Sequence, residues 1–485
     1  MRATDSRGDW APGRQFERNR ASSAVSSIAH SIDDEPLPQR QLVFAIISLA
    51  MLMSSVDQTI VATALPTLQR DLHAQINWSS WTITIYALGQ ILAMPLAGAL
   101  SDEYGRKRVF LIAVVIFTSA SLCCGLSTSI YTLIPLRAIQ ALGGGAFLPS
   151  ASGIVSDHYG RERDRALGMF SSIFPIGGAI GPILGGVFVT YWSWRGIFLV
   201  NVPIGIVLLI LAVKFLPHTP TRPTARTDFR GVALLGGFVL SAMYGVTSLG
   251  TGHQPLWGPT FAGAEALALV MGTLFIRHLR TFAAPVIPPR LLFGKGFAVM
   301  NTINFLFGSA ALGFGALVPL YAEDRYGIRS LSAGTLLTAR AVGMICSAAL
   351  AVVALRRTGY RPPMVVGFFT LASGLTLMAF RPPHTTPYVW LAIASGITGI
   401  GMGTLQPAAN NAVMHLDPTR IAAVSGLRGM IRQCGSITAI SVTTALLARN
   451  AHPGAALGHV FLVFAVLTVA TVPLIFYVPD HRGSW

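Results

Sequence analysis

The sequence predicts an all-α polytopic membrane protein in which fourteen spans form two six-helix bundles with two extra central transmembrane helices. The composition is the first observation: of 485 residues, 52% are hydrophobic and 11% are charged, with a mean hydropathy of +0.60. A soluble protein carries about a quarter charged residues. The second is a series of apolar segments long enough to cross a bilayer, which takes ~20 residues per helix. The third is an alternation of basic charge in the loops between them.

Fourteen apolar segments follow a polar N-terminal stretch. Their approximate bounds are residues 42–65, 79–100, 109–127, 131–153, 166–190, 197–216, 231–250, 258–277, 297–321, 331–354, 363–380, 387–412, 421–447 and 456–478. They group as six, two and six, because basic linkers that contain proline flank the seventh and eighth. The expected domains are a disordered cytoplasmic tail at 1–41, an N-terminal bundle at 42–216, a linker with two extra helices at 217–295, a C-terminal bundle at 296–478 and a cytoplasmic tail at 479–485.

Basic residues concentrate in the loops that follow the even-numbered segments. There are eighteen of them: Arg106, Lys107, Arg108, Arg161, Arg163, Arg165, Lys214, Arg222, Arg226, Arg230, Arg277, Arg280, Arg290, Lys295, Arg356, Arg357, Arg361 and Arg420. The loops on the other side hold six: Arg70, Arg195, Arg325, Arg329, Arg381 and Arg449. Because basic loops remain on the cytoplasmic side, we expect an even number of spans in the cell membrane (inner or plasma), with both termini in the cytoplasm.

The composition and motifs exclude several other classes of protein. The formal net charge of +16 would suggest a nucleic-acid partner in a soluble protein. Here the first forty residues hold equal numbers of acids and bases, so the excess belongs to the membrane part and we expect no nucleic acid. The four cysteines lie in apolar runs without metal-ligand or disulfide spacing. No catalytic motif stands in a suitable context, so we expect no enzyme, metal or cofactor.

Asp57 lies about fifteen residues into the first apolar segment, with no other charge nearby. A helix places it roughly 22 Å along the span, where a carboxylate costs at least ~2.5–3.5 kcal/mol. Such a position calls for protonation, a cationic partner or a water-filled cavity, and an acid that alternates between charged and neutral forms can carry a proton. The alternative is a capping or packing Asp near a helix end. Pro66, where we expect the helix to end, is nine residues further on, which argues against that alternative.

A very short turn separates the second and third segments, with the sequence Gly-Ala-Leu-Ser-Asp-Glu-Tyr-Gly-Arg-Lys-Arg from residue 98. Asp102 can cap or face a neighbouring helix end, and Gly105 permits the tight turn. The three bases that follow can anchor to headgroups or to acids of the next bundle. An ordinary positive-inside loop is the alternative. The residues of interest are Gly98, Asp102, Gly105, Arg106, Lys107 and Arg108.

This turn resembles the signature loop of the major facilitator superfamily, G-x-L-x-D-x-x-G-R-K-R. The family usually has a base directly after the Asp, where this chain has Glu103. A weaker echo, Leu-Arg-Arg-Thr-Gly-Tyr-Arg at residues 355–361, occupies the equivalent place in the second half. The resemblance implies two six-helix bundles that rock around a central cavity, with this loop as a conformational gate.

Glycines repeat every fourth residue in the fifth segment, at Gly177, Gly181 and Gly185. They make one smooth helical face that lets another backbone approach closely, and Pro182 favours a bend. Ordinary helix packing is the alternative. With Gly186, the run resembles the G-x-x-x-G-P-x-x-G-G motif of the antiporter branch of the superfamily. There it is understood to keep outward and inward cavities from connecting, so the resemblance implies antiport rather than symport.

Arg137 lies a turn or two inside the outer end of the fourth segment, at a depth similar to that of Asp57. It resembles the buried Arg of drug/proton antiporters, although Ala141 replaces a usual Gly. A snorkelling Arg is the alternative. Residues 54–66 resemble the L-D-x-T-I-V-N-V-A-L-P motif of the fourteen-span drug/proton antiporters, with two departures from it. The resemblance implies that Asp57 and Arg137 take part in proton transfer, and we hypothesise that they pair.

Further polar and aromatic residues fall inside the apolar segments. Trp81 and Tyr86 stand where the fourteen-span branch has W-x-x-x-x-Y, and Arg432 and Gln433 also look family-like, whereas Arg428 replaces what is commonly an uncharged polar residue. The candidates for lining a substrate cavity are Gln58, Trp81, Tyr86, Gln90, Asn301, Asn304, Arg340, Gln406, Asn410 and Asn411. For each, an interhelical hydrogen bond is the alternative. Glu265 is expected to lie outside the transport core.

Together these features predict a proton-coupled antiporter that exports amphipathic small molecules such as drugs, antibiotics, toxic metabolites or lipids by alternating access. The proton gradient would supply the energy without a cofactor, and the partners would be the substrate, protons and the lipid bilayer, with the chain acting as a monomer. Few acids and several arginines suit neutral, zwitterionic or anionic compounds at least as well as dications. A proton-coupled symporter or importer of a metabolite and a non-transporting sensor on a transporter fold are the alternatives.

Overall fold

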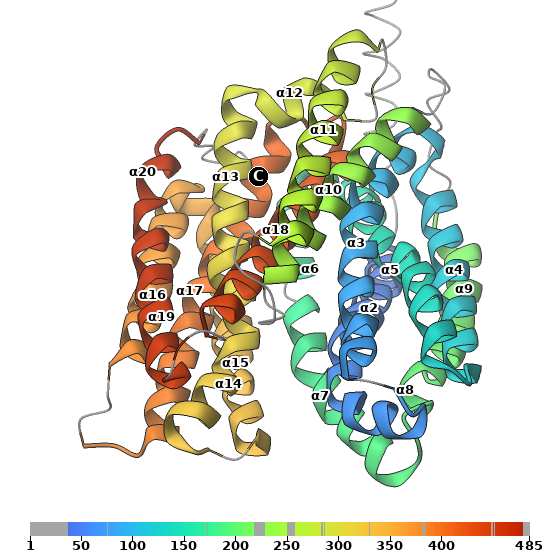
Figure 1. Ribbon diagram of the computed structural model, residues 1–485. Helices are drawn as coiled ribbons and strands as arrows, with labels where there is room; N and C mark the ends of the chain where they lie inside the picture. Colours follow the sequence, from blue (N-terminus) through green and yellow to red (C-terminus); the bar gives the residue numbers. More distant parts are fainter. Residues whose placement is uncertain are drawn as a thin grey trace, which may run out of the picture.

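The computed structural model describes residues 37–478 except for 75, 172, 218–227, 250–257, 283, 284, 286, 329, 381–383, 448, 449 and 451. Within these residues all regular secondary structure is helical (Figure 1). Eleven of the described helices are long and apolar enough to cross a membrane. The predicted all-α, multi-pass membrane class is therefore confirmed.

The N-terminal half forms one bundle, on the right of Figure 1. Its helices are α2 (Leu37–Asp71), α3 (Ile76–Tyr104), α4 (Arg106–Leu126), α5 (Ile130–His158), α6 (Arg163–Ser171), α7 (Ile173–Tyr191), α8 (Gly196–Leu199) and α9 (Asn201–Phe215), with the 3₁₀ turn η1 (Gly160–Glu162) after α5. Within the bundle α2 packs along α7, while α5 packs along both α3 and α4. The contacts of α2 with α5, α7 and α9 decide the surroundings of its one buried acid.

Helix α2 is longer at both ends than the predicted first segment. It already includes residues 37–41, which we had assigned to a disordered tail, and it continues beyond Pro66 to Asp71. Its first turn is held by the Tyr159 hydroxyl, which donates to the carbonyl of Arg40 at 3.0 Å. The rest of the predicted N-terminal tail and the predicted tail at 479–485 lie outside the described residues.

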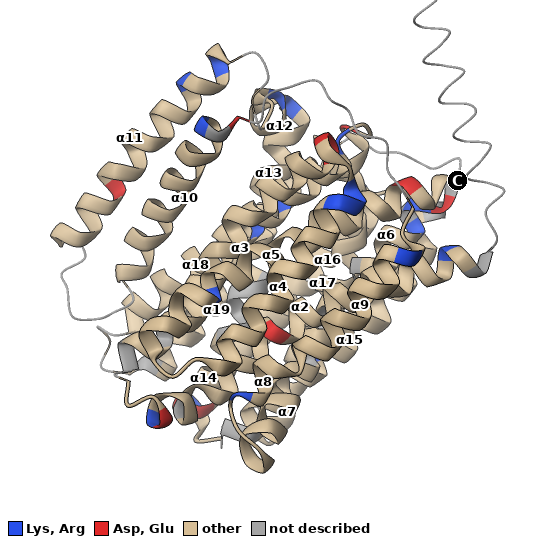
Figure 2. Ribbon diagram, turned by 90° about the vertical axis from the view of Figure 1, so that its right-hand side faces the viewer, with Lys and Arg blue, Asp and Glu red and all other residues tan. Residues whose placement is uncertain are grey.

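The middle of the chain forms two long helices, α10 (Phe229–Leu249) and α11 (Pro259–Thr281), followed by the short α12 (Pro289–Phe293). Helices α10 and α11 pack on each other, and α10 also contacts α3 of the N-terminal half and α18 of the C-terminal half. Figure 2 shows the pair standing to one side of the remaining helices. At one end of the pair, Asp228 accepts a hydrogen bond from the backbone N–H of Gly231 at 2.8 Å, and its carboxylate lies 2.7 Å from Nε2 of His278.

The C-terminal half forms a second bundle, on the left of Figure 1. Its helices are α13 (Lys295–Phe307), the π-helix η2 (Gly308–Gly313), α14 (Phe314–Tyr326), α15 (Ser330–Thr358), α16 (Arg361–Ala379), α17 (Pro387–His415), α18 (Ile421–Leu447), α19 (Pro453–Ala470) and α20 (Val472–Ile475). The π-helix interrupts the predicted segment 297–321 where it packs on α18. There Ser309 donates to the carbonyl of Gly435 at 3.0 Å, and a Cβ at Gly308 would collide with the backbone of Arg432.

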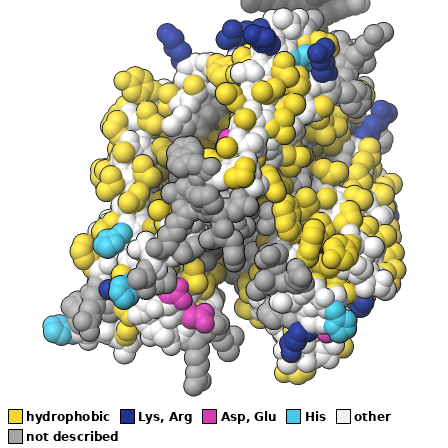
Figure 3. All heavy atoms as spheres, viewed as in Figure 1, with side chains coloured by type: hydrophobic (Ala, Val, Ile, Leu, Met, Phe, Trp, Pro, Cys, Tyr) yellow, Lys and Arg dark blue, Asp and Glu magenta, His cyan; other side chains and the backbone are white. Residues whose placement is uncertain are grey.

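The two halves meet mainly along α3, α5 and α18, and along α6, α15 and α17. Ser425 of α18 donates to the hydroxyl of Ser152 of α5 at 2.9 Å, which marks one of the closest approaches. In Figure 2 many of the Lys and Arg residues gather at the end of the molecule where α12 lies. Figure 3 shows a notch between the halves at the opposite, lower end. The structure is thus closed at its basic end.

Candidate functional site

Asp57 lies in the interior of the N-terminal bundle with no exposed surface. Its Oδ2 accepts a hydrogen bond from Nη1 of Arg137 at 2.7 Å, which makes a buried ion pair. Its Oδ1 accepts two more, from Nε2 of Gln140 at 2.8 Å and from Nδ2 of Asn201 at 2.9 Å. The hypothesised pairing of Asp57 with Arg137 is therefore confirmed, and its partners come from α5 and α9.

Arg137 points into the bundle and does not snorkel, because its side chain has no exposed surface. The guanidinium carbon lies 4.0 Å from the centre of the Tyr86 ring, an arrangement that favours a cation there. Nη1 also donates to Oε1 of Gln140 at 2.7 Å, and Nε donates to the carbonyl of Thr82 at 3.3 Å. Tyr86, predicted to line a substrate cavity, instead covers the arginine within the N-terminal bundle.

Gln140 and Asn201 complete the site, and neither was predicted. Both are buried, and both amide groups also reach Ser121 of α4, Gln140 at 2.6 Å and Asn201 at 3.4 Å. The sequence held a signal for Gln140, which follows Arg137 by three residues and therefore shares its helical face. Asn201 held none, because it begins a helix 144 residues beyond Asp57 and only the packing of α9 brings it near.

Asp102 joins the two halves at the basic end. Its Oδ2 accepts a hydrogen bond from the backbone N–H of Ala423 at 3.0 Å, in the first turn of α18. Unpaired N–H groups and the helix dipole make such an end favourable for a carboxylate. Gly98 lies on the same contact, where a Cβ would come within 2.9 Å of the Ala423 Cα. The prediction that Asp102 faces a neighbouring helix end is confirmed, and Gly105 turns the chain with φ 95°.

The three bases after Gly105 do not all behave as expected. Arg106 pairs with Asp157 and donates to the carbonyl of Gly153, so it binds α5 of its own half rather than the next bundle. Lys107 donates from Nζ to the carbonyls of Val213 at 2.9 Å and of Leu216 at 2.5 Å, and so holds the C-terminal end of α9. Of the three bases, only Arg108 is exposed, as expected of a base that binds lipid headgroups. The prediction of headgroup or inter-bundle anchors is wrong for Arg106 and Lys107, because carbonyls and an acid of their own half lie nearer.

The glycine face of α7 packs against α2. A Cβ at Gly177 would lie 2.7 Å from the Ser55 hydroxyl, and Cβ atoms at Gly181 and Gly185 would come within 3.0 Å of the Val56 carbonyl and 2.8 Å of the Ile60 carbonyl. Gly186, by contrast, faces open space, with nothing within 4 Å of such an atom. Pro182 lies inside the helix. The expected close backbone approach is confirmed for the three-glycine face, and its partner is the helix that carries Asp57.

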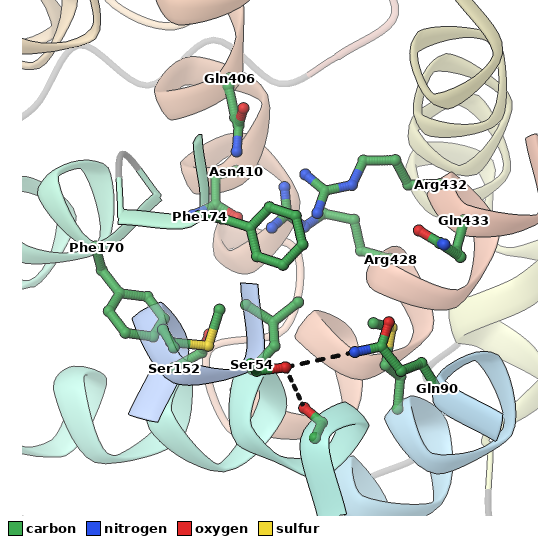
Figure 4. A pocket seen from close by; sticks show the side chains of 14 residues that line it. Ser54, Gln90, Ser152, Phe170, Phe174, Gln406, Asn410, Arg428, Arg432 and Gln433 are labelled. Atoms are coloured by element: carbon green, nitrogen blue, oxygen red, sulfur yellow. Dashed lines mark hydrogen bonds between the residues drawn. The ribbon is translucent and has the colours of Figure 1, made fainter. Parts of the chain in front are cut away.

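A pocket opens between the two halves. Its lining residues are Met51, Ser54, Gln90, Met94, Gly144, Leu148, Ser152, Phe170, Phe174, Gln406, Asn410, Arg428, Arg432 and Gln433. Ser54 donates to the carbonyl of Gly144 at 3.3 Å and accepts from Nε2 of Gln90 at 3.4 Å (Figure 4). Asp57 follows Ser54 by three residues on α2, about one helical turn, and does not itself line the pocket.

Among the predicted cavity residues, Gln90, Gln406 and Asn410 line this pocket and the others lie elsewhere. Trp81 stacks on Tyr244 of α10, with ring centres 6.0 Å apart.

Asn301 donates to the carbonyls of Leu291 and Leu292, which ties α13 to α12. Asn304 donates to the carbonyl of Met300 in its own helix. Gln58 and Arg340 are half-buried on α2 and α15, and Asn411 is buried on α17. The two asparagines of α13 therefore form hydrogen bonds within the protein and do not line the pocket.

The comparisons with known proteins identify the family. The sequence profile of the Major Facilitator Superfamily matches residues 47–440 and, in a second match, 300–485. The chain belongs to the major facilitator superfamily. It is 28% identical over 401 residues to Multidrug resistance protein 3 of Bacillus subtilis (strain 168), covering 81% of this chain and 77% of that one. It is 27% identical over 450 residues to the multidrug transporter protein MdtP of the same organism, covering 92% and 80%.

The superfamily fold is also seen in a solved structure. The proton:xylose symporter XylE superposes with a TM-score of 0.66 at 14% identity, covering 92% of this chain and 97% of that one. Such low identity shows the fold alone. Within the described residues, no group of three or more His, Cys, Asp or Glu side chains lies close enough together to hold a metal ion.

Two arginines of the pocket were noted in the sequence but not assigned to the site. Arg428 and Arg432 lie one turn apart on α18, in the C-terminal half of the superfamily fold. Phe170 of α6 and Phe174 of α7 face them from the N-terminal half (Figure 4). The charge at position 428, where an uncharged polar residue is common, was the signal in the sequence that could have led to them.

Proposed function

We propose that this protein is a proton-coupled antiporter that exports amphipathic small molecules by alternating access. The observation that carries the proposal is the buried ion pair between Asp57 and Arg137, with its N–O distance of 2.7 Å and its two amide donors. A buried pair is stable only while both charges are present, because removal of one leaves the other without a counter-charge in a medium of low dielectric. Proton binding to Asp57 therefore leaves Arg137 without its counter-charge, which favours a rearrangement of the helices around the pair.

The packing around Asp57 supports a link from protonation to movement. The carboxylate is held from α5 and α9, while the turns of α2 before and after it rest on the glycine face of α7. Helix α7 in turn contacts α15 of the other half. When Asp57 is neutral, its hold on Arg137 weakens and α2 can shift against α7. We propose that this shift favours release of the contact between Asp102 and α18 and opening of the basic end.

Antiport is favoured over symport by the three-glycine face and by the relatives named for multidrug resistance or transport. The fold itself does not distinguish antiport from symport, since a proton:xylose symporter shares it. A symporter or importer of a metabolite remains the second transport mechanism to test. A sensor on a transporter fold would move no substrate in any assay.

We further propose fourteen spans with both termini on the cytoplasmic side of the cell membrane. Three predicted segments fall outside the eleven apolar helices, each with a visible reason. The fifth segment contains residue 172, which lies outside the described residues, the ninth segment is interrupted by η2, and α18 carries two arginines. The gathering of Lys and Arg at the closed end supports a cytoplasmic position for that end.

Replacement of Asp57 by Asn tests the proposal. Asn keeps the size of the side chain but cannot take up a proton, so we expect coupled export of a dye and antibiotic panel to fall to the level of cells without the pump. The measurement is efflux from a pump-deficient cell, with protein quantity checked in the membrane. Asp324→Asn, at an exposed position, is the matched control and should export normally.

The direction of coupling is tested with purified protein in vesicles. Antiport predicts that an inward proton gradient drives substrate out of the vesicle lumen. Accelerated uptake under the same gradient would support symport instead, and full activity of the Asp57→Asn variant at neutral pH would exclude Asp57 as the coupling acid.

A further inference from the structure

Arg428 and Arg432 differ from the other buried cations of the described chain. Five Lys and Arg residues there expose 9% or less of their surface: Arg106, Lys107, Arg137, Arg428 and Arg432. The first three bind acids or backbone carbonyls. Arg428 and Arg432, 4% and 8% exposed, form neither an ion pair nor a hydrogen bond with any residue that the structure describes.

Two buried like charges one turn apart are unfavourable on two grounds. Each guanidinium has lost most of its water, and the pair repel each other across the helix turn. None of the described residues that line their pocket is acidic, so within that part of the chain the two positive charges of the pocket have no compensating acid. An anion between the two groups would relieve both penalties, and guanidinium groups bind carboxylate, sulfonate and phosphate with paired hydrogen bonds.

The pocket is also divided by polarity. Both guanidinium groups point toward the same space beside Phe174 and Asn410 (Figure 4). The C-terminal half supplies the cations and the amides of Gln406, Asn410 and Gln433. Much of the surface that the N-terminal half contributes is apolar, with the side chains of Met51, Met94, Leu148, Phe170 and Phe174. A ligand that fits this division has an anionic group at one end and an apolar body at the other.

We propose that Arg428 and Arg432 bind the anionic group of an amphipathic substrate, whose apolar body packs against Phe170 and Phe174. This inference rests on the proposed function, because it names the class of compound that the transporter carries. The pocket of the closed structure holds about 30 Å³ of free volume, which is room for water only. Substrate therefore enters when the two halves move apart, and their closure presses the aromatic side against the cationic side.

The charge of the substrate determines how transport responds to membrane potential. Export of a monoanion in exchange for one proton moves two positive charges inward, whereas a neutral substrate moves one and a monocation moves none. Each charge that crosses 100 mV corresponds to about a 50-fold concentration ratio. We expect the current per exported molecule to be about twice as large for an anionic probe as for its neutral analogue.

The test uses the purified full-length protein and three probes that share one naphthalene body and end in a sulfonate, a neutral amide or a quaternary ammonium. Binding is measured in detergent, and transport current in vesicles at a potential set by potassium and valinomycin. For the wild-type protein we expect the sulfonate to bind most tightly. Arg428→Gln and Arg432→Gln should each weaken sulfonate binding by about tenfold or more and leave amide binding within twofold.

Two further variants keep the result interpretable. Arg428→Lys retains the charge without the planar fork and should lose less sulfonate affinity than Arg428→Gln. Arg277→Gln, an exposed arginine on α11, is the matched control and should bind all probes like wild type. Thermal unfolding of each variant shows whether it is folded, and the Gln variants should unfold at a temperature no lower than wild type, because a buried unpaired charge has been removed.

Equal affinity for the three probes, or sulfonate binding unaltered by both Gln substitutions, would overturn the inference. In that case proton-driven export of the amide or ammonium probe would leave the proposed function intact. Conversely, sulfonate binding that depends on both arginines, without any response of transport to a proton gradient, would support the anion site and contradict proton coupling.

Discussion

Asp57 and Arg137 show how a buried charge is made tolerable at the scale of single residues. The carboxylate has three donors, and the guanidinium has an acid, an amide oxygen, a carbonyl and an aromatic face. Such charge-assisted bonds are stronger than neutral ones. Residues of α2, α5 and α9 together stabilise the pair, so a substitution of Asp57 or Arg137 alters contacts among all three helices.

Removal of Arg137 should harm the protein more than removal of the whole pair. Arg137→Leu leaves Asp57 buried without its counter-ion, and breaking a buried pair in this way typically costs about 3–5 kcal/mol. The double variant Asp57→Asn/Arg137→Leu has no isolated charge, so we expect it to unfold at a higher temperature than the single variant. Thermal unfolding in detergent measures this order, and a double variant less stable than Arg137→Leu would show that the pair is not energetically coupled.

Helices α7 and α2 pack unusually closely because the face between them lacks side chains on α7. Three glycines let the two backbones come together, and Ser55 adds a hydrogen bond from its hydroxyl to the carbonyl of Phe174 at 2.5 Å. Because α2 carries Asp57, its distance from α7 determines how the ion pair is placed. Packing of this kind depends on the absence of side chains and tolerates no additional atoms.

Substitution on the glycine face should separate the two helices. Gly181→Leu places side-chain atoms where Val56 and Thr59 already lie, so we expect proton-coupled export to be lost or greatly reduced. Gly186→Leu, on the open face of the same helix, introduces the same side chain without a collision and is the matched control. Efflux rate per molecule in the membrane is the readout. Equal activity of the two variants would show that the close approach is dispensable.

Contacts between α3 and α5 of the N-terminal half and α18 of the C-terminal half hold the whole molecule closed at its basic end. They combine a carboxylate on the first turn of α18, glycine contacts at 98 and 426, and a serine pair across α5 and α18. The halves touch at the basic end, while a notch separates them at the other (Figure 3). Alternating access requires that these contacts break once in each cycle.

A disulfide across the serine pair should hold the molecule in the closed arrangement. The hydroxyls of Ser152 and Ser425 are 2.9 Å apart, so cysteines at both positions are close enough to be oxidised together. In a background without the four native cysteines, we expect the double variant Ser152→Cys/Ser425→Cys to lose transport on oxidation and to regain it on reduction. Each single variant serves as a control. Transport that continues with the disulfide formed would mean that this contact stays closed throughout the cycle.

The sequence by itself determined the class of protein, its family and the two charged residues at the centre of the site. These features are local: hydropathy is summed over about twenty neighbouring residues, and a motif is a short run of the chain. Asp57 and Arg137 stood out because a charge in an apolar run is costly wherever the helix lies. Helix ends were less predictable, since α2 includes residues 37–41 and continues beyond Pro66, outside the apolar segment. At its first turn the Arg40 carbonyl accepts a hydrogen bond from Tyr159, a contact that hydropathy does not describe.

Only the tertiary structure decided which residues act together. Gln140 and Asn201 join Asp57, Lys107 caps α9, and Asp102 meets a helix 321 residues further along the chain. Several predicted cavity residues turned out to hydrogen-bond within the protein, while two arginines came to lie in the pocket between the halves. A side chain's role depends on which helix faces it, and that choice is made by the packing of all the helices at once, which no short segment encodes.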